Sequence, residues 1–262
     1  MDDISTTVFI LLVVAALAAG WIDSVVGGGG LVQLPALLIA FPHAAPVHLL
    51  ATNKMASIAG TTVSSVTYWR RVRPDPKTAL ALAIPAFAGS LIGALIASHL
   101  PRSSFNPIIL IALVAVMIYT VAKPALGQTT MLRHTGRKHT VLAAGAGFTI
   151  GMYDGALGPG TGSFLVFALV GLLGYAFLEA SAKAKIANFA TNLASLVIFI
   201  PQGAGFWKLG LAMAAANMTG GYLGARTAVA KGATFVRLVF VVVVSAFILR
   251  IGYDVLRQFD LV

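Results

Sequence analysis

The chain of 262 residues contains no cysteine and little charge. The absence of cysteine excludes disulfides, thiolate metal ligands and cysteine nucleophiles. Charged residues make up 10 % of the chain, whereas a soluble domain carries about a quarter. The five histidines include no pair at the spacing of a helical metal site, so we expect no metal and no cofactor. The composition therefore argues against an ordinary soluble enzyme.

Hydrophobic residues are abundant instead, at 58 % of the chain with a mean hydropathy of +0.92. The apolar runs 6–19, 108–121 and 238–249 approach the roughly 20 residues that a membrane helix needs. No basic segment precedes the first run, so we expect it to be kept as a helix and not cleaved as a signal peptide. The sequence predicts an all-α polytopic membrane protein.

The net charge of +10 lies mostly in basic clusters between the apolar segments. The clusters at 70–77 and 123–138 predict cytoplasmic loops, and no basic domain remains for nucleic acid. In the second half the bias reverses, because the loop at 201–208 carries one lysine while several basic residues surround the next loop: Arg226, Lys231 and Arg237. Equivalent loops are therefore expected on opposite sides, as in inverted repeats. Arg250 and Arg257 count against this orientation.

The sequence aligns with itself without a gap at an offset of 131 residues, which is half the chain. Asp23 falls on Asp154, and each precedes a glycine-rich break, at 27–30 and 158–162. Chance similarity between apolar segments would not align the other matched residues: Lys54 with Lys185, Lys77 with Lys208, Gly89 with Gly220 and Gly93 with Gly224. The paired Gly-x-x-x-Gly motifs predict close helix packing. The chain is a duplicated unit.

We expect a first transmembrane repeat at 1–122, a cytoplasmic linker at 123–139 and a second repeat at 140–262. Each half divides into a first helix, a short piece after the glycine break and three longer segments. The expected segments are 5–26, 31–41, 46–69, 78–100 and 105–122, matched by 140–157, 162–173, 177–200, 208–230 and 235–253. The second piece of each half is too short to span a membrane, so broken or short helices are expected at the glycine motifs.

Most charged residues lie near the ends of these segments, but four lie too deep to reach the membrane surface easily, and each costs about 2.5–3.5 kcal/mol at mid-membrane: Asp23, Asp154, Lys54 and Lys185. One interpretation is a stabilising Asp–Lys ion pair within each half; the other is a substrate or ion site. The lysines head matched polar stripes on one helix face, Lys54-Ser57-Thr61-Ser64 and Lys185-Asn188-Asn192-Ser195. Helix packing alone does not account for a lysine at the head of both stripes, so a polar cavity is favoured.

The glycine breaks complement the lysines. Irregular backbone at membrane depth survives only where it is buried or lines a cavity, and a short helix after each break would direct N–H groups into that cavity. The expected substrate-binding residues are Lys54, Lys185, Ser57, Thr61, Asn188, Asn192, Gly28, Gly29, Gly30, Gly160, Thr161, Gly162 and Ser163. Asp23 and Asp154 would orient the lysines or carry coupling protons.

Two other polar features are given simpler interpretations. Glu179 and Lys183 lie four residues apart and have no match in the first half, so we expect an ordinary ion pair at a helix end. Ser163 follows a glycine run but lacks a well-placed histidine base, which argues against an intramembrane serine hydrolase.

Three motifs resemble the TauE/SafE sulfite exporter family: Gly-x-x-Asp-x-x-x-Gly-Gly-Gly-Gly at 20–30, Ala-Thr-Asn-Lys at 51–54 and Tyr-Asp-Gly-x-x-Gly-Pro-Gly-Thr-Gly-Ser at 153–163. Lys185-x-x-Asn188-x-x-x-Asn192 is similar to the second signature of that family. The resemblance covers essentially the whole chain. It implies a bacterial inner-membrane protein, usually with about eight transmembrane helices, that moves sulfite, sulfoacetate or a related anion.

We therefore expect a transporter, not an enzyme, that moves a small sulfur-containing oxyanion such as sulfite, thiosulfate or an organosulfonate across the inner membrane, coupled to protons. The alternatives are a passive anion channel, a transporter of another small anion such as a carboxylate, and a membrane subunit that transports nothing. The expected partners are the anionic substrate and the lipid bilayer, with no nucleic acid. Self-association, the direction of transport and the coupling ion stay open.

Overall fold

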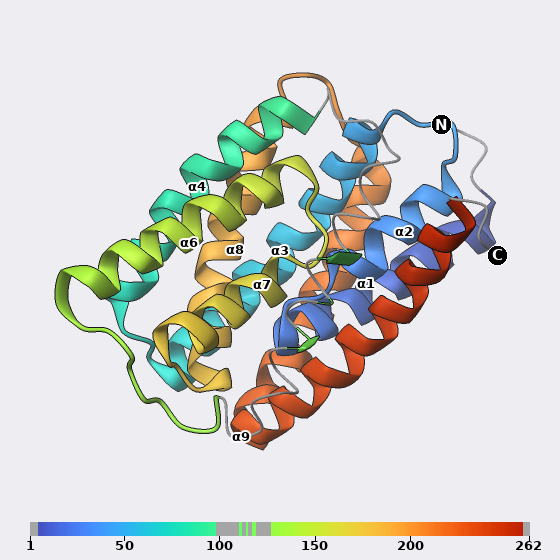
Figure 1. Ribbon diagram of the computed structural model, residues 1–262. Coiled ribbons are helices and arrows are strands. Elements are labelled where there is room, and N and C mark those ends of the chain that lie inside the picture. The colour runs from blue at the N-terminus through green and yellow to red at the C-terminus, as the bar shows by residue number, and fades with distance from the viewer. Residues whose placement is uncertain (1–4, 98–109, 112–113, 115–116, 119–126, 259–262) are drawn as a thin grey trace.

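The computed structural model describes residues 5–97, 110, 111, 114, 117, 118 and 127–258, and these residues form a bundle of helices without a strand among them (Figure 1). The first half contains α1 (Thr6–Val26), α2 (Gly30–Ala40), α3 (Pro46–Val72) and α4 (Pro76–Ala97). The second half contains α6 (Gly136–Ala156), α7 (Thr161–Ala168), the π-helical turn η2 (Leu169–Leu173), α8 (Phe177–Phe199) and α9 (Trp207–Gln258). The all-α prediction is confirmed.

The helices begin where the repeat predicts. Adding 131 to the first residues of α2, α3 and α4 gives the first residues of α7, α8 and α9. Both short helices after the glycine breaks are present, and α9 is interrupted at Gly232 (φ 77°, ψ −172°), between the segments expected at 208–230 and 235–253. The segment expected at 105–122 lies largely outside the described residues. Helix α6 starts at Gly136, so the last residues of the expected linker are already helical.

The first helix of each half packs against a helix of the other half, α1 along α9 and α6 along α4 (Figure 1). The paired Gly-x-x-x-Gly motifs make these crossings close. A Cβ atom on Gly89 of α4 would meet the Phe148 carbonyl of α6, and one on Gly220 of α9 would meet the Leu17 carbonyl of α1. The close packing predicted from these motifs is confirmed, and it interleaves the two halves.

Helices α3 and α8 contact each other between these two helix pairs, α8 against α4 and α3 against α9. Two apolar clusters flank them. One contains Phe177 and Phe240, and the other contains Leu49 and Phe199, all fully buried. The centre of the bundle is thus enclosed by helices from both halves.

The outer surface is apolar, as expected for contact with lipid. Large side chains such as Ile84 and Leu211 are more than half exposed. Within the described part of the chain, three helices are long and apolar enough to cross a membrane: Thr6–Val26, Pro76–Ala97 and Trp207–Arg257. Helices α3 and α8 carry the polar stripes and lie mostly inside the bundle.

Candidate functional site

The two glycine breaks cross each other at the centre of the bundle. Helix α1 ends at Gly27, whose φ of 85° lies in the left-handed region that favours glycine. A Cβ atom on Gly27 would collide with the backbone of Gly162. The N–H of Ser163 donates to the Gly27 carbonyl at 3.0 Å, and its Oγ donates to the Val26 carbonyl at 2.9 Å. The irregular backbone is therefore buried in protein, as its depth requires.

The charged residues form two ion pairs, and both pairs join the halves. Lys54 Nζ lies 2.5 Å from Asp154 Oδ2, and Lys185 Nζ lies 2.8 Å from Asp23 Oδ2. The ion pair considered within each half is therefore wrong. Because the breaks cross, each aspartate lies against the lysine of the other half and not against the lysine of its own half. Both side chains of the Lys54 pair are 2 % exposed, whereas Asp23 is 13 % exposed.

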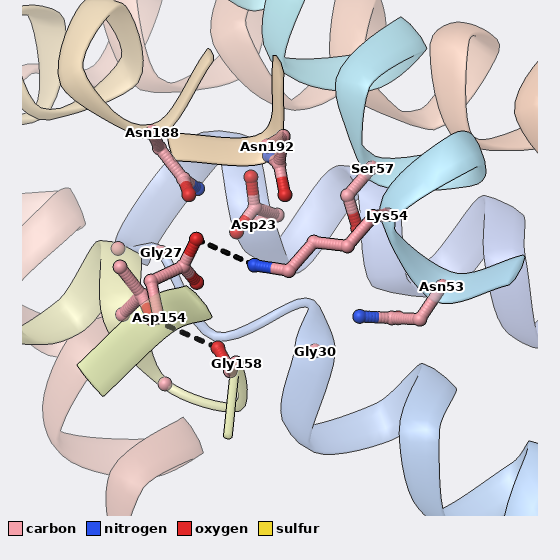
Figure 2. A pocket seen from close by; sticks show the side chains of 13 residues that line it. Asp23, Gly27, Gly30, Asn53, Lys54, Ser57, Asp154, Gly158, Asn188 and Asn192 are labelled. Carbon is pink, nitrogen blue, oxygen red and sulfur yellow. Dashed lines mark hydrogen bonds and ion pairs between the residues drawn. The ribbon is translucent and has the colours of Figure 1, made fainter. Parts of the chain in front are cut away.

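A small polar cavity adjoins these charges. It holds about 10 Å³, the space that one water molecule needs. Figure 2 shows Lys54 reaching from α3 to Asp154, with Asn188 and Asn192 of α8 above them and Asn53 beside them. The lining residues are Asp23, Gly27, Gly30, Asn53, Lys54, Ser57, Asp154, Gly158, Gly160, Thr161, Gly162, Asn188 and Asn192.

Most of the residues predicted for the site meet at this cavity. The predicted residues that line it are Lys54, Ser57, Asn188, Asn192, Gly30, Gly160, Thr161 and Gly162, together with Asp23 and Asp154. The starts of α2 and α7 therefore both lie at the cavity wall. The expected meeting of lysine, polar stripes and short-helix starts is found in the structure.

The other predicted residues lie beside the cavity and contact other groups. Lys185 is held by Asp23, and the Thr61 hydroxyl donates to the Ser57 carbonyl of its own helix at 2.9 Å. The N–H of Gly29 donates to Asp23 Oδ1 at 3.4 Å. Gly28 faces the Phe247 ring of α9, and Ser163 binds the first break as described above.

The distal ends of the polar stripes join helices. The Ser64 hydroxyl contacts the Ser24 hydroxyl of α1, and the Ser195 hydroxyl lies 3.0 Å from that of Ser90 on α4. Each stripe thus has a head at the cavity and a tail that packs against the neighbouring helix. The two interpretations of the stripes, packing and cavity lining, apply to different parts of the same helix.

Three lining residues were not in the predicted set: Asn53, Gly27 and Gly158. Asn53 has no polar counterpart under the repeat, because the shifted position is Ala184. Its signal in the sequence was an amide beside a buried lysine in an apolar helix. Among the described residues, three buried side-chain polar atoms have no hydrogen-bond partner, and two of them belong to this cavity: Asn53 Oδ1 and Asn192 Nδ2.

A chain of buried amides supports Asn53 from behind. Gln33 Nε2 donates to the Asn53 backbone carbonyl at 3.5 Å, and Gln33 Oε1 accepts from Asn217 Nδ2 at 2.9 Å. Asn217 also donates to the Ala16 carbonyl of α1 at 3.0 Å. Helices α1, α2, α3 and α9 are thereby tied together next to the cavity.

A second polar cluster lies where α4, α6 and α8 begin. The Lys183 side chain is 1 % exposed. Its Nζ lies 3.9 Å from the centre of the Tyr175 ring and 3.8 Å from Glu179 Oε2. The expected ion pair at the helix end is therefore present, but the deep burial of Lys183 against the Tyr175 ring was not expected. The Tyr175 hydroxyl contacts Thr78 Oγ1 at 3.1 Å and His139 Nε2 at 3.2 Å. Within the described ranges, no group of three or more histidine, aspartate or glutamate residues could hold a metal ion.

Comparisons with known proteins agree on one family. The model of the family described as sulfite exporter TauE/SafE matches residues 12–251. A "Probable membrane transporter protein ORF9" of Sinorhizobium sp. is 36 % identical over 254 residues, which cover 97 % of this chain and 96 % of that protein. The "Probable membrane transporter protein YfcA" of Escherichia coli K12 is 32 % identical, over 93 % of this chain and 89 % of that protein. A "Probable membrane transporter protein" of Haemophilus influenzae is 31 % identical, over 96 % of this chain and 97 % of that protein. No solved structure matches.

Proposed function

This chain belongs to the sulfite exporter TauE/SafE family of membrane transporters, and from that premise we propose that it moves a small sulfur-containing oxyanion through the central cavity, together with protons. The candidate substrates are sulfite, thiosulfate and organosulfonates such as sulfoacetate. The bacterial inner membrane is the proposed location. The single observation that supports an anion most strongly is Lys54, a buried ammonium group in the wall of a cavity whose other lining groups are neutral amides, helix starts and two carboxylates, Asp23 and Asp154, that are each held in an ion pair.

The N-terminal ends of α2 and α7 add to the attraction of the cavity for an anion. The first N–H groups of a helix have no partner within it, and they carry the positive end of the helix dipole. Gly30 and Thr161 begin these two helices, and both line the cavity. Discontinuous helices in other transporters present the same kind of end to anionic groups. In the proposed site, one helix end comes from each half.

The charge balance of the site supports the coupling of anion transport to a proton. Two lysines and two aspartates cancel, so an anion entering alone would bring an uncompensated charge into a site of low polarity. Lys54 is already bound to Asp154, and the other carboxylate at the cavity, Asp23, is bound to Lys185. A proton on Asp154 would release Lys54 and keep the total charge unchanged when a singly charged anion binds. Asp154 is therefore the proposed proton carrier.

The proposed transport cycle opens the cavity to one side at a time. The present cavity accommodates no more than a water molecule, so an oxyanion enters only when the surrounding helices separate. We place the two halves in opposite orientations across the membrane, because the basic loops reverse between them. Because the halves interleave, the moving units in this proposal are the α1–α9 pair and the α4–α6 pair, and rocking of one pair against the other would expose the Lys54–Asp154 pair alternately.

The test is transport in proteoliposomes that contain the purified full-length protein. Labelled sulfite, thiosulfate and an organosulfonate are measured with and without a proton gradient, in both directions. A transporter gives saturable flux that the gradient accelerates. Flux that is unsaturable and insensitive to the gradient would identify a passive channel, and saturable flux of acetate in place of the sulfur compounds would identify a carboxylate transporter.

A further inference from the structure

We propose that Asn53 is a substrate-contacting residue and that the cavity around Asn53 and Lys54 selects singly charged oxyanions over dianions of the same size. This inference rests on the proposed function, because it concerns the charge of the anion that the same site binds. It adds a residue for which the repeat provides no match, and it names the charge class of the substrate: among the candidates it favours hydrogensulfite over thiosulfate and sulfoacetate, which are dianions at neutral pH.

The first observation is the unpartnered amide. Asn53 is 3 % exposed, lines the cavity, and its Oδ1 has no hydrogen-bond partner among the described residues. Asn192, which lines the cavity from α8 of the other half, has an unpartnered Nδ2. Buried polar atoms are rarely left unpaired unless a ligand or water completes them. An oxyanion can accept from Asn192 Nδ2 and from the Asn53 amide nitrogen, which points toward Lys54 in Figure 2, whereas Asn53 Oδ1 can accept from a bound water or from the hydroxyl of hydrogensulfite.

The second observation is the way Asn53 is held. Gln33 donates to the backbone carbonyl of Asn53, and Asn217 donates to Gln33, so the turn of α3 that carries Asn53 is tied to α2 and α9 beside the cavity. None of the three has a polar counterpart under the repeat. The shifted positions are Ala184, Phe164 and Ala86. The polar support exists on one side of the cavity only, so the two halves contribute unequally to the site.

The third observation is the charge that the cavity can offer. Lys54 lines it, whereas Lys185 lies behind Asp23 and is fully buried against that carboxylate. Neutralising Asp154 therefore frees one positive charge. A singly charged anion replaces the Asp154 charge one for one, but a dianion leaves an extra negative charge beside Asp23. Neutral amides then satisfy the remaining oxygens without adding charge, which favours the singly charged anion.

Sulfate and methanesulfonate provide the test, because both are tetrahedral around sulfur and similar in size but differ by one charge. Each is added as a competitor of labelled sulfite transport by the full-length protein in proteoliposomes. We expect methanesulfonate to compete at least about tenfold better than sulfate, because the extra negative charge of sulfate is repelled by Asp23. Equal or stronger competition by sulfate overturns the inference while sulfite transport still supports the proposed function. Absence of sulfite transport overturns the proposed function itself.

Two substitutions test the role of Asn53. Asn53→Leu has a similar volume without hydrogen-bonding atoms, and it should raise the KM for sulfite and the inhibition constant of methanesulfonate about tenfold. Asn53→Lys adds a second cation, so it should improve sulfate competition relative to methanesulfonate by at least about tenfold. Unchanged constants in Asn53→Leu, or an unchanged ratio in Asn53→Lys, contradict the assignment.

The matched control is Ser65→Ala. Ser65 lies on the same helix, and its hydroxyl is also buried without a partner, but it does not line the cavity. Its loss should leave both constants unchanged. If Asn53→Leu does not reach the membrane, Asn53→Ser provides the same test of affinity, because it shortens the polar group and keeps the site neutral. An Asn53→Ser variant with the parental KM then counts against the proposal.

Discussion

Lys54 Nζ lies 2.5 Å from Asp154 Oδ2, although the two residues are 100 positions apart and belong to opposite halves of the chain. The Lys185–Asp23 pair repeats the relation in reverse. Neither half contains a complete Asp–Lys pair at the cavity, so the centre of the site exists only after the halves have assembled. Function and folding therefore depend on the same contacts.

Single and double substitutions in the Lys54–Asp154 pair should separate its contribution to transport from its contribution to folding stability. Lys54→Met leaves a buried carboxylate without its partner, which costs about 3–5 kcal/mol of folding stability. The double variant Lys54→Met/Asp154→Asn removes both charges and should recover most of that stability. Transport should be absent from both variants. Thermal unfolding of the purified protein and sulfite uptake in proteoliposomes measure the two effects.

Lys185→Met should also abolish transport, for a different reason. Without Lys185, the Asp23 carboxylate at the cavity is unpaired and repels an anion. Lys185→Met/Asp23→Asn should recover stability in the same manner as the first double variant. Normal transport by both single lysine variants, at normal levels in the membrane, would contradict the site assignment.

The crossing of the two breaks should not tolerate a side chain. Gly27→Ala puts a Cβ on a residue with φ of 85°, which costs about 1–2 kcal/mol for the backbone alone, and that Cβ also meets the backbone of Gly162. We expect a large fall in the midpoint of thermal unfolding. Gly145→Ala on α6 is the control, because nothing lies within 4 Å of its new Cβ. That change should stabilise by about 0.5–1 kcal/mol. A Gly27→Ala protein as stable as the parent would disprove the close crossing.

Asp75 should give the loop between α3 and α4 a pH-dependent stability. Its carboxylate accepts from the N–H groups of Thr78 at 2.9 Å and Lys77 at 3.2 Å. Partial burial raises the pKa of Asp75, but a hydrogen bond from the Thr78 side chain, these two backbone bonds and the nearby Lys183 charge together outweigh it and hold the pKa below its ordinary value of 3.8. The stabilisation is therefore complete above that value and is lost as the pH falls through the lower folded-state pKa.

Asp75→Ala should cost about 0.5–2 kcal/mol at neutral pH, the usual effect of losing a helix cap. Asp75→Asn should cost less, because asparagine also caps helices. The difference in stability between Asp75→Ala and the parent should shrink in acid. Unfolding measured from neutral pH to below 3.8 tests this, and a difference that grows in acid would show that the sign is wrong.

The cluster at the start of α8 should depend on the aromatic ring of Tyr175. Lys183 Nζ lies 3.9 Å from the ring centre, and the lysine is almost fully buried. Tyr175→Leu should destabilise the protein by about 2 kcal/mol, the size of a desolvated cation–π contact. Tyr175→Phe keeps the ring and loses the hydroxyl contacts to Thr78 and His139, at about 1 kcal/mol. If Tyr175→Phe is the more damaging of the two in thermal unfolding, the hydroxyl and not the ring is the main contact of the cluster.

Local patterns in the sequence predict the elements well because their causes are local. A run of glycines cannot continue a helix, so α2 and α7 begin where the breaks end. The stripe headed by Lys54 lies on one face of α3, and its first residues line the cavity. Matching residues by the shift of 131 also placed the starts of α3, α4, α8 and α9.

The pairing of charges could not be predicted in this way. Which lysine meets Asp23 depends on how the two breaks cross in space, and the repeat itself favoured partners within one half. Asn53 lies in the Ala-Thr-Asn-Lys motif, but the repeat does not indicate it as a site residue, because its counterpart is Ala184. The burial of Lys183 likewise results from its contact with Tyr175, and spacing along the helix contains no information about that neighbour.

The crossed ion pairs have a consequence for the origin of the chain. A polypeptide with a single repeat would leave its aspartate and its lysine without partners, whereas two identical copies around a twofold axis would satisfy both, each aspartate on the lysine of the other copy. The present molecule thus carries the contact pattern of a symmetric dimer within one gene product. Fusion of the copies also freed them to diverge, and the polar Asn53 opposite the apolar Ala184 is a difference that an ancestral dimer of identical chains could not have had.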